Sequence, residues 1–294
     1  ALKTAGRGFN QSREEESVMI GEYGKGILLG IIQGVTEWLP ISSTAHMLIF
    51  NRLCPLAVPP GFFALFTSVI QLASALAVLC LYAGRLFPPR SQRREGRRLW
   101  GRLLISCLPL VLIGLPADRL LERLFYSSSG VTRAGFVVIC ITLIFYGLLF
   151  VVWEAFWHRP ARYSDGKELS LTGAFGVGCA QILAVLPGTS RSGATVLGGR
   201  LAGLGRPEAA EYSFLLALPV MLGAGGLQTV KAVLAPAFAF TWELGGILAV
   251  GCLTAFGMSL LTVRGLVRFV RSHSFLPFGL YRIALGLLLA LFFT

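Results

Sequence analysis

The stretch GIIQGVTEWLPISSTAH, residues 30–46, decides the fold of this chain. It begins as an apolar, glycine-spaced helix in which Gln33 and Glu37 stand four residues apart and therefore share one face. The helix is expected to end before Pro40, because proline disfavours helical geometry in the residue that precedes it. The stretch therefore predicts two half-helices that are separated by a break.

The residues after the break are polar. Ser42 or Ser43 can cap the second half-helix, and Ser43 and His46 share one face of that helix. A carboxylate, an amide, hydroxyls and an imidazole thus converge at a break inside apolar sequence. Polar groups of this kind are costly to bury in a membrane, so together they indicate a functional site.

A second stretch repeats this design later in the chain. GCAQILAVLPGTSRSGAT, residues 178–195, is again apolar and glycine-rich, with Leu-Pro followed by hydroxyl side chains. Pro187 follows Pro40 by 147 residues, so the two motifs align without a gap. We predict a duplicated chain, with repeat 1 at about 24–155 and repeat 2 at about 171–294.

The composition is that of a membrane protein. Of the 294 residues, 55% are hydrophobic and 14% are charged, whereas soluble proteins carry about 25% charged residues. Several apolar runs reach the roughly 20 residues that span a bilayer as a helix, and a β-barrel would instead have short alternating segments. The net charge of +12 comes from residues between the spans, so a cytoplasmic-loop bias explains it better than nucleic-acid binding does.

The expected fold is all-α and integral to the membrane, with six transmembrane helices and two re-entrant helix hairpins. Because each half has an odd number of spans, the two halves form an inverted-topology repeat. Residues 19–294 form one membrane domain, and residues 1–18 are expected to be a tag or a disordered tail. The predicted hairpins are 24–52 and 171–204, and the predicted spans are 61–84, 103–117, 131–155, 208–231, 240–263 and 275–294.

Loop charges predict the orientation of the chain. One set of loops carries fifteen Lys and Arg residues, which is more than the opposite side carries. The positive-inside rule places that set in the cytoplasm, so both termini and the first hairpin are expected to face outward. The basic loops are 85–102, 156–168, 200–206 and 264–274.

The two breaks together suggest phosphoryl transfer. Helix N-termini near Ser43 and Ser190 are anion sites, and the guanidinium of Arg191 matches phosphate geometry. Glu37 beside a phosphate suits either a bridging divalent cation or an acid–base role. His46 could activate a serine or itself attack phosphorus. The aliphatic surroundings indicate a lipid substrate.

The chain resembles the undecaprenyl pyrophosphate phosphatases, a bacitracin-resistance type of lipid diphosphatase. The resemblance rests on QGVTE (33–37), LPISSTAH (39–46) and PGTSRSGAT (187–195), and it covers about residues 20–294. It implies an enzyme of the bacterial cytoplasmic membrane that recycles the lipid carrier of cell-wall synthesis. That enzyme would remove the terminal phosphate of undecaprenyl diphosphate, with a divalent cation (Mg²⁺ or Ca²⁺), in a cavity open to the outer face.

The resemblance also implies roles for individual residues. Glu37, Ser43, His46 and Arg191 would be catalytic, with the nucleophile left open between Ser43, His46 and water. Many members have Glu where this chain has Gln33, so a metal held by Glu37 and Gln33 would have one carboxylate fewer. The residues expected to hydrogen-bond the substrate are Gln33, Ser42, Thr44, Ser190, Ser192 and Thr195.

A transporter or flippase of a lipid phosphate or another anion is the alternative, because inverted repeats with broken helices are also a transporter design. A carrier needs Arg191 and the helix ends, whereas Ser43, His46 and Glu37 together suggest bond breaking. The expected partners are a polyprenyl diphosphate lipid and the bilayer. Nucleic acid is not expected, and a homodimer is left open.

Overall fold

The structure is a computed structural model, and it describes residues 2–59, 61–127, 130–156, 160–234 and 238–293. Apart from one ladder of two short strands, the regular structure in these ranges is helical. The strands are β1 (Tyr126–Ser127) and β2 (Gly130–Val131). The longer helices are α1 (Leu2–Thr36), α2 (Ser43–Leu53), α3 (Phe62–Leu86), α4 (Arg93–Pro109), α5 (Leu115–Phe125), α6 (Arg133–Phe156), α7 (Leu171–Ile182), α8 (Arg191–Leu201), α9 (Arg206–Val220), α10 (Gly226–Leu234), α11 (Trp242–Ser272) and α12 (Leu276–Phe293).

Among the described residues, five helical stretches are long and apolar enough to cross a membrane. They coincide with the first five predicted spans, which confirms a multi-pass membrane protein. The sixth predicted span, α12, is apolar but shorter. Residues 157–159 of the predicted loop 156–168 lie outside the described residues. The five stretches are Phe62–Leu86, Arg90–Ala117, Arg133–Phe156, Arg206–Leu234 and Trp242–Ser272.

Two of these stretches continue through a proline. Pro109 ends α4 and is followed by the π-helical turn η2 (Leu110–Gly114), and Pro219 in α9 is followed by η5 (Met221–Gly225). Proline removes a backbone donor and clashes with the carbonyl four residues earlier, and a π-turn accommodates that local disruption. The second span is longer than the predicted 103–117 because it begins at Arg90, inside the segment that was predicted to be the loop 85–102. Likewise, α11 runs to Ser272, through most of the predicted loop 264–274.

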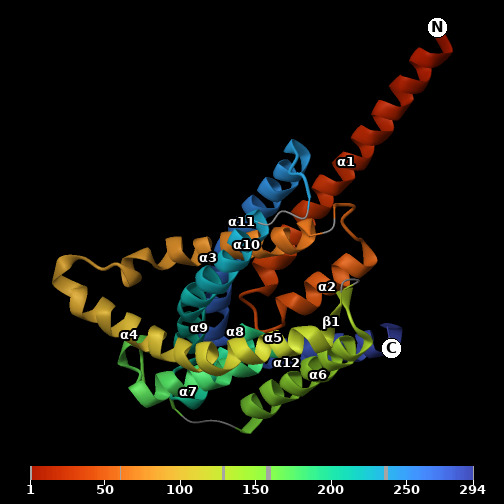
Figure 1. Ribbon diagram of the computed structural model, residues 1–294. Helices are drawn as coiled ribbons and strands as arrows, with labels where there is room; N and C mark the ends of the chain where they lie inside the picture. The colour runs from red at the N-terminus through yellow and green to blue at the C-terminus, as the bar shows by residue number, and fades with distance from the viewer. Residues whose placement is uncertain (1, 60, 128–129, 157–159, 235–237, 294) are drawn as a thin grey trace.

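The N-terminal residues differ from the prediction. Residues 2–18, expected to be a tag or a disordered tail, are helical and form the start of α1. Figure 1 shows this part of α1 projecting beyond the other helices. The stretch contains no proline, so nothing in its backbone interrupts a helix that begins in the apolar part of α1. That these residues are a tag remains a prediction.

The helices of the two halves pack against each other. The main contacts pair α1 with α11, α6 with α12, α3 with α11, and α4 with α7. Helix α8 lies in the interior, with Ser192–Gly199 buried throughout. Small residues permit this close packing. A Cβ on Gly34 would lie 2.6 Å from the carbonyl oxygen of Ala255, and one on Gly198 would lie 2.8 Å from the Cβ of Ala180.

Both predicted breaks are present and share an unusual backbone. Ser42 and Ser190 have φ of 75° and 73°, and they are the non-glycine residues with positive φ in the described part of the chain. Each serine caps the following helix, by accepting from the backbone N–H of Ala45 and Gly193 respectively. The cap follows Pro40 by two residues but Pro187 by three, so the second break is one residue longer than the gapless alignment predicts.

Candidate functional site

The two breaks line one cavity of about 280 Å³. The first residues of α2 and α8 both face it, which places the N-terminal ends of both half-helices at the same space, as predicted. Positive helix ends and N–H groups at one point favour an anionic ligand. The polar side chains that line the cavity are Glu37, Ser42, Ser43, Thr44, Gln71, Ser190, Arg191 and Gln228.

An ion pair joins the two breaks. Arg191 Nη2 lies 3.2 Å from Glu37 Oε1, and the exposed fractions of the two side chains are 14% and 6%. Arg191 also donates to the carbonyl of Ser213 at 3.2 Å, and its guanidinium lies 5.9 Å from the ring centroid of Trp38. The arginine of the second motif is therefore held beside the carboxylate of the first.

The other oxygen of Glu37 accepts two hydrogen bonds. Ser43 Oγ donates to Glu37 Oε2 at 2.7 Å, and Gln33 Nε2 donates to the same atom at 3.1 Å. Gln33 does not line the cavity, so it holds the carboxylate from behind. A hydroxyl within hydrogen-bond reach of a carboxylate has the geometry of a nucleophile and its base.

His46 lies apart from this group. Its Nδ1 is 2.7 Å from the carbonyl oxygen of Ser42, and its Nε2 is 2.6 Å from the hydroxyl of Tyr281 on α12. The two rings are stacked, with centroids 5.7 Å apart. His46 does not line the cavity, so the structure brings together Glu37, Ser43 and Arg191 of the four predicted catalytic residues.

Two of the predicted substrate-binding residues connect helices instead of facing the cavity. Ser192 Oγ donates to the carbonyl of Leu39 at 3.0 Å, which ties α8 to the first break. Thr195 Oγ1 lies 2.6 Å from Ser213 Oγ and so joins α8 to α9. Ser42, Thr44 and Ser190 do face the cavity.

Arg282 is a residue that the sequence reasoning missed. It is fully buried, and it donates to the carbonyls of Pro40 at 3.1 Å and Gly188 at 2.9 Å. It also donates to the carbonyl of Thr142, and no salt bridge involves it among the described residues. One guanidinium thus connects both breaks. A charge inside the last predicted span was the signal available in the sequence.

Gln71 and Gln228 are two further polar residues whose place in the site was not assigned. Both line the cavity, from α3 and α10, and Ser68 Oγ donates to Gln228 Oε1 at 3.2 Å. Each stands inside an apolar predicted span, which was the available signal. Their amides add hydrogen-bonding groups to the lining of the cavity.

The residues at the cavity can contribute to a divalent cation site but do not complete one. Among the described residues there is no group of three or more His, Cys, Asp and Glu that could hold a metal. Mg²⁺ and Ca²⁺ take oxygen ligands, and Mg²⁺ often uses one or two carboxylates with oxygens of the substrate. The carboxylate of Glu37, next to the hydroxyl of Ser43, fits a cation that shares its ligands with a diphosphate.

The chain is similar to known proteins over nearly its whole length. It is 40% identical to an undecaprenyl-diphosphatase of Acetivibrio thermocellus over 92% of this chain and 97% of that protein. It is likewise 40% identical to an undecaprenyl-diphosphatase of Lactobacillus delbrueckii subsp. bulgaricus, over 91% of this chain and 96% of that protein. An undecaprenyl-diphosphatase 1 of Clostridioides difficile is 38% identical, over 95% and 98% respectively.

The family model of the bacitracin resistance protein BacA matches residues 26–288. This range contains both breaks, the cavity between them and all five long apolar stretches. The match therefore covers the whole candidate site. The chain belongs to the bacitracin resistance protein BacA family.

Proposed function

We propose that this chain is an undecaprenyl-diphosphatase, which hydrolyses undecaprenyl diphosphate to the monophosphate and inorganic phosphate. The observation that carries the proposal is the Glu37–Arg191 ion pair beside Ser43, because it unites both motifs at one cavity. The names of the relatives support the substrate. The product would return to the lipid-carrier pool of cell-wall synthesis.

Binding of the diphosphate rearranges the ion pair. The phosphate oxygens compete with Glu37 for the guanidinium of Arg191, whose fork geometry suits phosphate. The N-terminal ends of α2 and α8 then stabilise the negative charge that remains. Once Arg191 binds phosphate, the carboxylate of Glu37 is released from the ion pair and can accept a proton.

Ser43 is the nucleophile in this proposal. Its oxygen attacks the terminal phosphorus while its proton passes to Glu37 Oε2, which already accepts a hydrogen bond from it. The bond between phosphorus and the bridging oxygen breaks, and undecaprenyl phosphate leaves. Water then attacks the phosphoserine, the proton on Glu37 returns to the serine oxygen as the bond between that oxygen and phosphorus breaks, and inorganic phosphate leaves with both protons of the water.

A divalent cation, Mg²⁺ or Ca²⁺, belongs to the proposal, with Glu37 and Gln33 as its protein ligands. When bound, it would neutralise charge on the diphosphate. Gln33 would have to rotate its amide oxygen toward the cation, since its nitrogen donates to Glu37. The substitution of Gln for a second carboxylate would weaken cation binding in the absence of substrate.

The finer architecture is also a proposal: six spans and two re-entrant hairpins in an inverted repeat. It is supported by the reciprocal packing of α1 on α11 and α7 on α4, because a shift of 147 residues relates α1 to α7 and α4 to α11. Loop charges favour a cavity open to the outer face, with both termini outside the cytoplasmic membrane. A homodimer remains one possible assembly.

Phosphate release in detergent tests the function, because no membrane has to be crossed there. We expect the purified chain to release phosphate from undecaprenyl diphosphate, and Glu37→Gln and Arg191→Lys to lose at least about 100-fold of that rate. Glu95→Gln is the matched control, since Glu95 is exposed and pairs with Lys167 away from the cavity. No release from any polyprenyl diphosphate, with or without divalent cations, would instead favour a carrier.

A further inference from the structure

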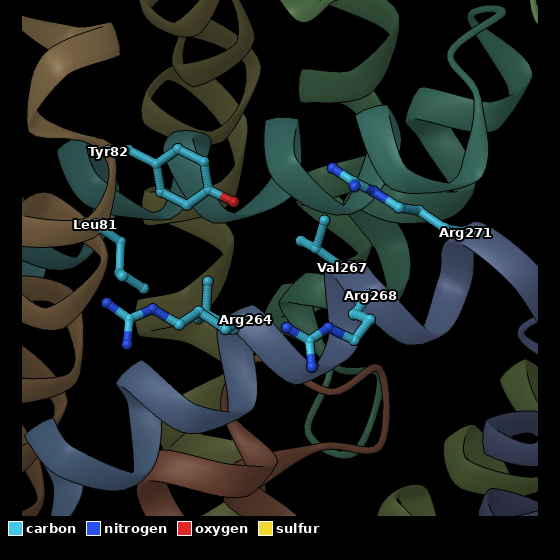
Figure 2. Close-up of a pocket in the computed structure, with 7 residues that line it drawn as sticks. Leu81, Tyr82, Arg264, Val267, Arg268 and Arg271 are labelled. Carbon is cyan, nitrogen blue, oxygen red and sulfur yellow. The ribbon is translucent and has the colours of Figure 1, made fainter.

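A second groove lies away from the candidate site, between α3 and α11, and has a volume of about 470 Å³. Its walls are apolar, formed by Leu81, Val263 and Val267, and Tyr82 contributes a phenol. Figure 2 shows Tyr82 and the arginines of α11 around this space. The three arginines are Arg264, Arg268 and Arg271, which the helical repeat places along one side of α11.

Arg264 and Arg268 have no carboxylate partner. Neither guanidinium makes a hydrogen bond or a salt bridge within the described part of the chain, and no Asp or Glu lines the groove. Arg85, nearby in sequence to Tyr82, is different because it pairs with Asp165 and Glu211. Arg271 borders the pocket that holds those acidic residues, so the unpaired charge belongs to Arg264 and Arg268.

The length of α11 places these arginines at the edge of the bilayer. The helix has 31 residues, which corresponds to about 46 Å at about 1.5 Å per residue, whereas the hydrocarbon layer is about 30 Å thick. The stretch from Leu244 to Val263 contains 20 uncharged residues and is enough to cross that layer. Arg264 and Arg268 then lie at headgroup level with Val267 between them, and Val263 marks the end of the acyl-chain level.

We propose that this groove binds one anionic phospholipid, such as phosphatidylglycerol. Its phosphate would be held by Arg264 and Arg268, with a hydrogen bond from the Tyr82 hydroxyl, and an acyl chain would lie along Leu81. Guanidinium groups bind phosphate strongly, and basic pockets between membrane helices suit anionic headgroups. A zwitterionic lipid would place its own ammonium group among these arginines, so it should bind less well.

Native mass spectrometry of the full chain in a mild detergent tests this site. Phosphatidylglycerol should bind in a saturable way, at least about tenfold more tightly than phosphatidylcholine. The double variant Arg264→Gln/Arg268→Gln should weaken phosphatidylglycerol binding by at least about tenfold. Leu81→Trp, which fills the groove but keeps every charge, should also weaken it. Phosphate release from undecaprenyl diphosphate in lipid-free detergent should stay within about twofold of wild type in both variants.

The matched control is Arg93→Gln/Arg94→Gln, which removes the same charge from exposed positions of α4 outside the groove. This variant should bind phosphatidylglycerol as wild type does. Equal weakening by both double variants would mean diffuse attraction to a basic surface and would overturn the proposal. Equal binding of phosphatidylcholine would also overturn it, as would displacement of the lipid by inorganic phosphate at the same concentration.

Discussion

Replacing Arg282 by methionine tests how the two breaks are held together. The guanidinium donates to the carbonyls of Pro40 and Gly188, and neither carbonyl has another hydrogen-bond partner among the described residues. A buried acceptor that loses its donor costs about 1–3 kcal/mol, so the two carbonyls together cost about 2–6 kcal/mol. The cost of burying the arginine itself offsets part of this loss.

Turnover should fall together with stability in Arg282→Met. Each carbonyl belongs to a break that carries one partner of the Glu37–Arg191 pair, and a misplacement of about 1 Å can reduce a rate by about 100-fold. The measurements are kcat for phosphate release and the midpoint of thermal unfolding in detergent. Arg282→Lys is the control, because it keeps the charge but cannot reach both carbonyls with a planar fork. If Arg282→Met kept the wild-type kcat and midpoint, the role assigned to this residue would be refuted.

Three further substitutions test the chemistry. Ser43→Ala should reduce kcat by at least about 100-fold while leaving the Kd for substrate unchanged; near-normal turnover would transfer the attack to water. Gln33→Glu should lower the Mg²⁺ concentration at half-maximal rate, because it adds a carboxylate ligand, whereas an unchanged requirement would argue against Gln33 as a ligand. His46→Ala should reduce kcat less than Ser43→Ala, since the imidazole contacts Tyr281 instead of the cavity. Equal losses in these two variants would place His46 in the reaction.

The sequence was most informative at the two breaks. In apolar sequence each polar residue is costly, so Glu37, Ser43 and Arg191 could be selected without knowledge of the fold. The duplication then predicted that the two motifs share one site. The structure agrees, because these three side chains meet at one cavity.

Contacts between residues far apart in the chain explain why the places of His46 and Arg282 could not be predicted from the sequence. Helical spacing placed His46 on the same face as Ser43, but its hydrogen-bond partner Tyr281 lies 235 residues away, on α12. Arg282 was visible as a charge in an apolar span, yet its carbonyl partners come from two distant breaks. Backbone carbonyls carry no sequence signal, so a residue that binds them cannot be paired from sequence alone.

The accuracy of the predicted helix bounds was limited by a different cause, the effect of proline on a helix. Proline normally ends a helix, and this rule located the breaks at Pro40 and Pro187 correctly. At Pro109 the chain instead makes a π-turn and continues as helix. The residues on the C-terminal side of each proline differ, because hydroxyl residues that can cap a new helix come after Pro40, whereas the apolar run LVLI comes after Pro109.

The central claim is that the two halves of the chain form one catalytic unit, and a double-mutant cycle between Glu37 and Arg191 tests it most directly. Glu37→Asp and Arg191→Lys each keep their charge and should leave a measurable rate. If the two side chains act together on the diphosphate, the loss of kcat/KM in the double variant should be smaller than the product of the two single losses. We expect the difference, which is the coupling, to be at least about tenfold. Losses that multiply without coupling would mean that the two residues act independently, and they would contradict the account.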